Sequence, residues 1–224
     1  HLPAKSTVQS HVIDISQEYI QRLIGLIVLI MMNVQGRSAV NAAGDSTGFS
    51  TNMYGRWYTA KYGDGSRRQY IKLHALISAD TDMPFFLTAV ATPSNVSDTK
   101  QLEPMIGMLN VNVSEVYLDK GYLSRSNAQL IADRGAVPYI AIKSNARPRS
   151  LGYPAWYGMV RMWKDDRDGY DEHYNRRSII EGIFSAVKRI MNQPVRSKVQ
   201  HNQEVEVMCR PVIWNITSLM YHIA

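Results

Sequence analysis

The sequence predicts an α/β fold in which helices flank a mixed β-sheet. Its 224 residues are 45% hydrophobic, which is enough for one sizeable core. β-rich runs come first with no helical pattern between them, and later runs alternate with segments of helical periodicity. The order is β-β-β-α-β-α-β, with extra helices at both ends of the chain. The strands are expected near residues 38–43, 68–79, 85–92, 113–118 and 137–142.

The first strands are marked by the turns that follow or separate them. Small residues lead into Gly44-Asp45-Ser46-Thr47-Gly48, which predicts a buried strand that ends in a polar turn, with Asp45 at its carboxyl end. A glycine-bearing turn at 63–66 separates two β-rich runs, 57–62 and 68–79, and predicts a hairpin.

The fourth strand is broken by a second polar turn. The residues after it read Asp119-Lys120-Gly121-Tyr122, so Asp119 is expected at that strand's carboxyl end.

The helices are bounded by residues typical of helix ends. They are expected at 16–33, 99–109, 124–133, 172–191 and 204–221. Ser97 or Asp98 is the candidate cap of the second helix, and Ser124 that of the third. Pro211 should kink or split the last. Residues 144–170 are predicted as an irregular connection with one short helix near 157–164.

One helix carries most of the chemistry. At about 3.6 residues per turn, Tyr174, Arg177, Glu181 and Lys188 form one polar ridge along residues 172–191. An apolar stripe beside the ridge is expected to be buried. Because this stripe flanks Glu181, its carboxylate is expected to be partly buried, where a cation would offset the cost of its charge. The stripe consists of Ile180, Ile183, Phe184, Val187 and Met191.

Composition limits the classes of protein that fit. The single cysteine, Cys209, excludes an internal disulfide framework and fits a reducing compartment such as the cytosol. The longest apolar run, 23–32, is too short for a membrane span, which needs about 20 residues. The chain opens with His1 and has no signal-peptide pattern, so a processed form or a piece of a longer protein is expected.

The charge favours a polyanionic partner without identifying it. The net charge is +6 and the pI about 9.4. Each phosphate that a basic side chain neutralises releases counterions, which favours nucleic acid. An ordinary solvated basic surface remains the alternative. One basic cluster, 143–149, supplies Lys143 and Arg147 as candidates for DNA contact.

The predicted order of elements is similar to the ribonuclease H-like fold. In that fold the first and fourth strands are neighbours, which would bring Asp45 and Asp119 together, with Glu181 arriving from the helix. Oxygen ligands without histidine or cysteine suit Mg²⁺, or Mn²⁺ as a substitute. Two such ions can activate a nucleophile on one side of a phosphate and stabilise the leaving oxygen on the other.

At these residues the chain resembles the catalytic domain of DDE-class insertion-sequence transposases, over roughly residues 39–191. The matching residues are Asp45 in Gly-Asp-Ser-Thr, Asp119 in Leu-Asp-Lys-Gly-Tyr, and the spacing Y-x2-R-x3-E-x6-K that begins at Tyr174. Softer matches lie at 72–74, which contains Lys72, and at 92–98.

The resemblance implies roles for the matching side chains. Asp45, Asp119 and Glu181 would be the catalytic metal ligands for two Mg²⁺ ions. Arg177 and Lys188 would grip phosphates, and Tyr174 would stack on a base or hold a phosphate. Lys72 joins these candidates for contact with DNA.

The resemblance also implies an activity and an organisation. The expected activity is hydrolysis of double-stranded DNA at transposon ends followed by strand transfer of the 3′-hydroxyl into target DNA. We expect a homodimer on DNA, in the cytoplasm and associated with the nucleoid. Residues 39–192 would form the catalytic domain and 193–224 a C-terminal helical extension, while 1–38 would be a helical segment, the tail of a missing DNA-binding region.

Other interpretations of the same residues stay open. The chain could be a ribonuclease H-like nuclease without strand transfer, or an inactive transposase-derived module that binds DNA. Asp45 could cap a turn, Asp119 could belong to a strand-end turn, and Glu181 could simply pair with Arg177 at i, i+4. His74 is expected to pack or hydrogen-bond and not to act in catalysis.

Overall fold

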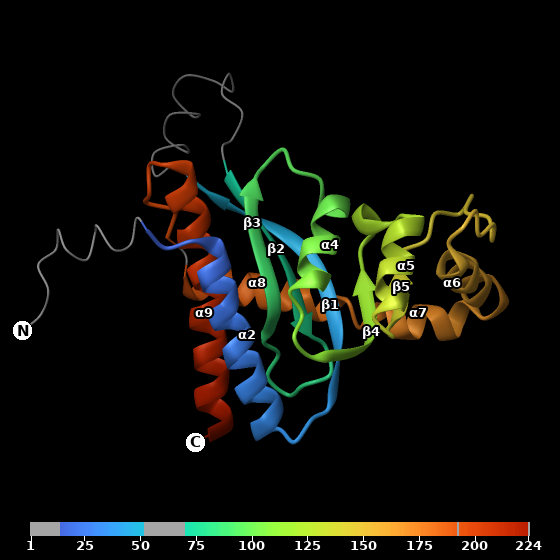
Figure 1. Cartoon of the computed structure of the whole chain (residues 1–224), viewed down its shortest axis with the longest axis horizontal. Helices are drawn as coiled ribbons and strands as arrows, with labels where there is room; N and C mark the ends of the chain where they lie inside the picture. The colour runs from blue at the N-terminus through green and yellow to red at the C-terminus, as the bar shows by residue number, and fades with distance from the viewer. Residues whose placement is uncertain (1–13, 52–69, 192, 224) are drawn as a thin grey trace, which may run out of the picture.

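The computed structural model describes residues 14–51, 70–191 and 193–223. It confirms the α/β class: the described chain forms a five-stranded mixed sheet flanked by helices, in the ribonuclease H-like arrangement (Figure 1). The strands are β1 Ala39–Ser50, β2 Tyr70–Ser78, β3 Phe86–Pro93, β4 Asn112–Leu118 and β5 Val137–Ile140. The helices are α2 Gln17–Val34, α4 Asp98–Gly107, α5 Arg125–Asp133, α6 Pro154–Asp165, α7 Arg167–Asn175, α8 Ser178–Ile190 and α9 Gln200–Ile223, with a short 3₁₀ helix, η1, at Lys120–Tyr122.

The strand order is β3-β2-β1-β4-β5. β1 pairs antiparallel with β2 and parallel with β4, and β4 pairs parallel with β5. The first and fourth strands are therefore neighbours, as the sequence predicts. Because each parallel connection must cross over the sheet, α4 and α5 serve as the crossovers that return the chain to β4 and β5.

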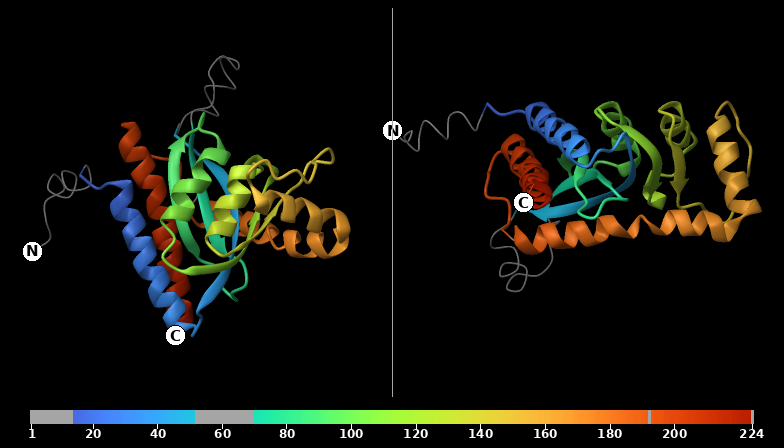
Figure 2. Two further views of the ribbon diagram at one scale, coloured as in Figure 1. Left: turned by 45° about the vertical axis from the view of Figure 1, so that its right-hand side comes forward. Right: turned by 90° about the horizontal axis from the view of Figure 1, so that it is seen from below.

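The helices cover both faces of the sheet. α4 and α5 lie on one face, and α7 and α8 run along the other (Figure 2). The buried side chains of β2 and β3, such as Leu73, Leu76 and Phe86, are fully enclosed between these layers. α8 crosses β1, so side chains on its inner side come close to the middle of the sheet.

The exposed edge of the sheet at β3 is closed by side-chain amides. Gln17 and Gln21 of α2 accept hydrogen bonds from the backbone N–H groups of Ala91 and Ala89. Asn215 of α9 accepts from the N–H of Phe86 at 2.7 Å and donates to its carbonyl at 2.8 Å. An open edge strand invites pairing with other chains, so α2 and α9 act as the cover that prevents it.

Three expectations about secondary structure need correction. The prediction that residues 144–170 form an irregular connection with one short helix is wrong. Two helices begin there, α6 at Pro154 and α7 at Arg167. A proline in the first helical turn loses no hydrogen bond, and it favours the start of α6. Trp156, Met159 and Val160 then form a buried stripe. The last helix, α9, is not split, since it runs unbroken through the buried Pro211.

The third correction concerns the motif helix. A single helix over 172–191 is wrong: α7 ends at Asn175 and α8 begins at Ser178. Between them the backbone bonds have the tighter i to i−3 spacing, as from Arg177 N to the Tyr174 carbonyl at 2.9 Å. Tertiary contacts hold this joint, because Arg176 donates to the Tyr117 hydroxyl.

The predicted strand at 57–62 and turn at 63–66 lie outside the described residues. Among the described residues, β2 forms its hairpin-like antiparallel pairs with β1 and β3. No described helix combines the length and the apolar character that crossing a bilayer requires.

Gly44 occupies a position in β1 that leaves little room for a side chain. A Cβ there would overlap methyl groups of Leu118 and Leu76 on the two neighbouring strands. Gly44→Val is expected to lower the free energy of unfolding by about 1–3 kcal/mol through overpacking. Gly158→Ala in α6 is the control, since nothing lies within 4 Å of its Cβ, and it should stabilise by about 0.5–1 kcal/mol. Urea unfolding measures both, and equal midpoints for Gly44→Val and the parent would contradict the expectation.

Candidate active site

The parallel pairing of β1 with β4 places two aspartates side by side. The last pair in the register joins Gly44 to Leu118, so Asp45 and Asp119 are the next residues on each strand. β1 does not end there. The predicted polar turn at 44–48 is wrong, because β1 continues to Ser50 by pairing with β2, with Asp45 opposite Ala75. Asp45 therefore lies where β4 leaves β1, at an opening in the sheet and not at a strand's end.

The third acid comes from the first turn of α8. Glu181 accepts a hydrogen bond from Arg177 Nη2 at 2.6 Å, and Arg177 Nη1 donates to Asp45 Oδ2 at 3.1 Å. The guanidinium thus binds acids from β1 and α8 at once. The i, i+4 pair between Arg177 and Glu181 exists, but it is one half of this bridge.

The environments of the two bridged acids differ. The Asp45 side chain is 25% exposed, and that of Glu181 is 57% exposed. The expectation of a partly buried Glu181 is wrong, since the buried stripe of α8 passes beside it and leaves the carboxylate outside.

Electrostatics show that the three acids share one region. Burial raises the pKa of Asp45 above its usual value. The N–H of Ser46, which donates to Asp45 Oδ1 at 2.7 Å, and the Arg177 charge act in the opposite direction. The nearby carboxylates of Asp119 and Glu181 raise this pKa further. Because these like charges repel one another, a cation in addition to Arg177 would stabilise the group of three acids.

The donor set fits a hard cation, although the acids are not closed into a ligand cage. No three acids, histidines or cysteines among the described residues stand at metal-binding separations. Arg177 lies between two of the carboxylates and takes the position of a counter-ion. The Tyr122 hydroxyl is also buried, has no hydrogen-bond partner among the described residues, and lies within electrostatic reach of Asp98, Asp45 and Asp119. Carboxylate oxygens with an unpaired hydroxyl beside them suit Mg²⁺ and its bound water.

Tyr174 belongs to the same site. The centre of its ring lies 5.9 Å from the Arg177 guanidinium. Burial raises the pKa of its hydroxyl, Arg177 opposes this, and Asp119 and Asp45 add to it. Tyr174 is therefore within electrostatic reach of both aspartates, from the end of α7.

Lys188 lies further along α8 and forms a separate contact. Its ammonium is 5.6 Å from the Phe49 ring, and the Arg210 guanidinium stacks on the same ring at 4.0 Å. Burial and the Arg210 charge lower the pKa of Lys188. The two cations thus share the Phe49 ring. Burial lowers the pKa of Arg210, and the nearby Glu206 carboxylate acts in the opposite direction.

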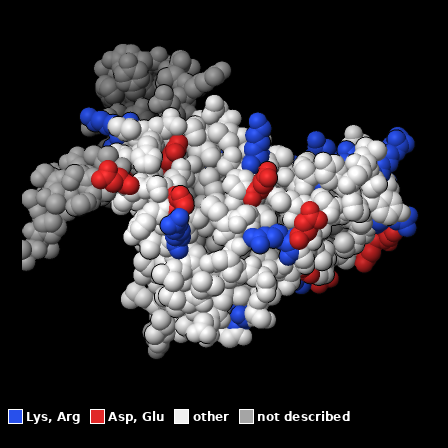
Figure 3. Space-filling view, viewed as in Figure 1, with Lys and Arg blue, Asp and Glu red and all other residues white. Residues whose placement is uncertain are grey.

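The other basic candidates lie outside this centre. Lys72 of β2 is bound by Asp98 at 2.8 Å and donates to the Val96 carbonyl at 3.3 Å, so its charge is already neutralised. Lys143 and Arg147 lie in the connection before α6, where the Arg147 carbonyl accepts from Trp156 Nε1. Lys and Arg side chains gather over this end of the molecule (Figure 3).

The contacts that Asp98 makes were not predicted from the sequence. It was a candidate helix cap, but Ser97 holds the cap position of α4, and neither makes the capping bond expected there. Asp98 instead contacts Lys72 and the Nδ1 of the buried His74 at 3.2 Å. Burial raises the pKa of Asp98, but hydrogen bonds from His74, Lys72 and Ser46 outweigh it and hold this pKa well below the usual value.

Asp98 lies between the segments that carry Asp45 and Asp119. Ser46, one of its partners, follows Asp45 directly. On the other side, Gly121 of η1 packs so closely that an added Cβ would lie 3.3 Å from Asp98 Oδ2. Thr99 also donates to the Gly121 carbonyl at 2.5 Å. The sequence signal for this network was Lys72-Leu-His74, two side chains on one face of a strand.

If Asp45 and Asp119 hold a metal, as the resemblance in the sequence implies, Asp98→Asn is expected to weaken metal binding and cleavage by about 10–100-fold, because loss of a residue that orients metal ligands has an effect of this size. Mn²⁺ affinity measured by electron paramagnetic resonance reports this independently of cleavage. Asp80→Asn is the matched control, because Asp80 also pairs with a basic side chain, that of Arg37 at 2.9 Å, but away from the acids. Parent-like Mn²⁺ affinity in Asp98→Asn would contradict the role.

Comparison with known families decides the assignment. The family description "Transposase DDE domain" matches residues 42–216, which include all three acids. The chain belongs to this family of transposase DDE domains. The match covers most of the chain and confirms the resemblance seen in the sequence. No solved structure matches the transposase chain.

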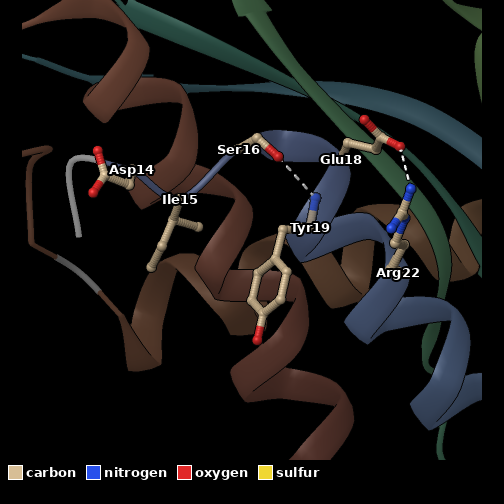
Figure 4. A pocket seen from close by; sticks show the side chains of 6 residues that line it. All are labelled: Asp14, Ile15, Ser16, Glu18, Tyr19 and Arg22. Carbon is tan, nitrogen blue, oxygen red and sulfur yellow. Dashed lines mark hydrogen bonds and ion pairs between the residues drawn. The ribbon is translucent and has the colours of Figure 1, made fainter. Parts of the chain in front are cut away.

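One hollow of the described surface lies apart from Asp45, Asp119 and Glu181. It has a volume of about 510 Å³ and lies at the start of α2, where Ile15, Tyr19 and Arg22 line it (Figure 4). It is open to solvent and mixes a few polar and apolar side chains. The three acids line no part of this hollow, since they come from β1, the end of β4 and α8.

Proposed function

We propose that this transposase domain cleaves double-stranded DNA at transposon ends by metal-dependent hydrolysis and transfers the freed 3′-hydroxyl into target DNA. The observation that carries the proposal is the Arg177 bridge, which joins Asp45 of β1 to Glu181 of α8. Residues 136 positions apart in the sequence are thereby held at one point of the surface, beside Asp119.

Asp45, Asp119 and Glu181 are the groups that would hold the metal. Two Mg²⁺ ions, or Mn²⁺ in their place, would activate the attacking oxygen and neutralise charge on the leaving oxygen. The chain's own contribution is to hold these carboxylates close together. Burial raises the pKa of Asp45, and both the Ser46 N–H and the Arg177 charge limit that rise.

Arg177 would exchange its partners when DNA and metal bind. Its planar fork matches two phosphate oxygens as well as it matches two carboxylates. A divalent ion that takes over the charge of Asp45 and Glu181 would free the guanidinium for the phosphate next to the cleaved bond. Tyr174, whose ring adjoins it, would stack on a base or hold a phosphate.

The remaining basic residues would bind DNA away from the acids. Lys188, with Arg210 beside it, would hold a backbone phosphate along α8. Lys143 and Arg147 would meet flanking DNA near α6. For Lys72 the pair with Asp98 favours a structural role over a phosphate contact.

The proposed reaction also implies an oligomeric state and a cellular location. Because two transposon ends must be joined to one target, we propose a homodimer on DNA, in the cytoplasm at the nucleoid. We further propose 39–192 as the catalytic unit, with 1–38 the helical tail of an end-recognising region and 193–224 an extension.

The test is an assay on supercoiled plasmid DNA that carries the transposon ends, with Mg²⁺ or with EDTA. Nicked, linear and joined products are separated on one gel. Cleaved and joined products with Mg²⁺ alone are expected. Cleavage without joining would favour a ribonuclease H-like nuclease, and DNA binding without any cleavage would favour an inactive binding module.

A further inference from the structure

The outward side of α2 and α9 carries an unusual group of exposed apolar side chains. Six of them define what we call the outer face: Leu26, Leu29 and Ile30 of α2, and Ile213, Ile216 and Met220 of α9. Their exposed fractions range from 41% to 66%. Single exposed leucines are ordinary on a protein surface, but a contiguous patch is not.

The two helices present these residues as one surface. They run parallel and side by side, since Gln17 bonds Glu204 at their starts and Gln35 bonds His222 at their ends. Both are anchored inward by amides on the β3 edge. Their remaining sides therefore face solvent together (Figures 1 and 2).

The outer face has no ionic side chain. Residues 23–35 and 211–223 contain no Lys, Arg, Asp or Glu. The space-filling view is white over the ends of α2 and α9 at its lower left (Figure 3). A helix that is apolar on all sides belongs in an interior, yet here only the inner side of α2 is covered by the described chain.

The absence of charged side chains limits the kind of partner that can cover the outer face. Nucleic acid needs basic side chains, and the face has none. A helix that lies on a bilayer usually has Lys or Arg along its polar side, which these segments lack. Two copies of a chain with net charge +6 repel each other, and they repel least where neither presents a charge.

The size of the face also fits a second copy. With roughly 200 Å² on a large side chain, the six residues expose on the order of 600 Å² of apolar surface. A stable interface buries about 800 Å² per partner, so smaller neighbours on the same helices would complete it. Uncharged helices related by a two-fold axis are self-complementary.

We propose that the outer face is the interface through which two copies of this chain form a two-fold symmetric dimer in the absence of DNA. The dimer buries a four-helix layer made of α2 and α9 from each copy. It leaves the Asp45, Asp119 and Glu181 surface of both copies open, because those residues lie on β1, just after β4 and on α8.

Sedimentation velocity of the full chain without DNA or metal tests the interface. The parent is expected to be a dimer at about 10 µM, and Leu29→Glu and Ile216→Glu to raise the dimer dissociation constant about 30-fold or more. Ile190→Glu is the matched control, since Ile190 is a helical residue 67% exposed on α8, outside the outer face. It should sediment as the parent does.

Two results of the sedimentation measurement would contradict the proposed dimer. A monomeric parent at this concentration overturns it, as does a dimer that both glutamate variants leave intact. Binding of the parent to neutral lipid vesicles would assign the face to a membrane surface instead. Circular dichroism melting confirms that the variants are folded. The measurement involves no cleavage, so its failure would leave the proposed DNA chemistry untouched.

Discussion

Asp119→Ala is expected to abolish Mg²⁺-dependent cleavage of supercoiled DNA, with a rate loss of at least about 10³-fold. Asp119 follows the last residue of β4 and makes no side-chain capping bond to η1. Its removal costs the fold no capping hydrogen bond at η1, so the melting temperature in EDTA should stay near that of the parent. A loss of activity with an intact fold is the pattern of a metal ligand.

Asp133→Ala is the matched control for this prediction. Asp133 is an acid at the end of α5 whose carboxylate only accepts from Gln129, at 2.7 Å. Its replacement should leave cleavage near the parent's. In addition, Mg²⁺ should raise the melting temperature of the parent and of Asp133→Ala, because an ion that binds the native state stabilises the native state. The melting temperature of Asp119→Ala should rise much less. Equal cleavage by the parent and Asp119→Ala would remove the proposed mechanism.

Arg177→Met is expected to reduce cleavage by about 10²–10³-fold, the size of effect typical for loss of one preorganised donor at a reacting group. The variant also removes a positive charge that lowers the pKa of Asp45. The pKa of Asp45, already raised by burial, then rises further. The acid limb of the pH–rate profile should therefore move to higher pH in Arg177→Met.

The same substitution gives a signature in stability. A carboxyl whose folded-state pKa is raised favours the fold below its unfolded pKa, and this contribution is lost as pH rises through the folded pKa. In EDTA the stability difference between Arg177→Met and the parent should thus grow from pH 4 to pH 7. Mg²⁺ should narrow it, because the ion replaces the missing charge.

Arg22→Met is the control for Arg177→Met. Arg22 forms an i, i+4 pair with Glu18 at the same 2.6 Å distance, but both side chains are about three-quarters exposed. Exposed pairs of this kind contribute roughly 0–1 kcal/mol, so its pH dependence should match that of the parent. If Arg177→Met behaves like Arg22→Met in cleavage and in pH dependence, Arg177 is only a surface ion pair.

Local sequence signals predicted the elements that depend on local physics. The small-residue strand before Asp45, the Ser124 cap of α5 and the break after Asp119 are all present. Ser124 accepts the hydrogen bond from Asn127 N that its position implies. These features are decided by caps and turns within a few residues, so the sequence alone is sufficient for them.

Other expectations failed where distant partners override local preference. The polar stretch after Gly44 looks like a turn, yet it is a strand because residues 70–74 pair with it. Asp98 looks like a cap, but it turns to Lys72 and His74 across the sheet. Glu181 looks half-buried from its apolar neighbours, and only the rotation of α8 on β1 shows its side chain outside.

The sequence by itself determined the α/β class and the family, because spacing along strands and helices is a local property of the chain. Only the tertiary structure decided that Arg177 joins Asp45 to Glu181, that Asp98 lies between the segments of Asp45 and Asp119, and that α2 and α9 share one uncharged face. These contacts join residues that are more than 50 positions apart or that belong to different helices and strands. Long-range packing and electrostatics decide such contacts after the local elements have formed.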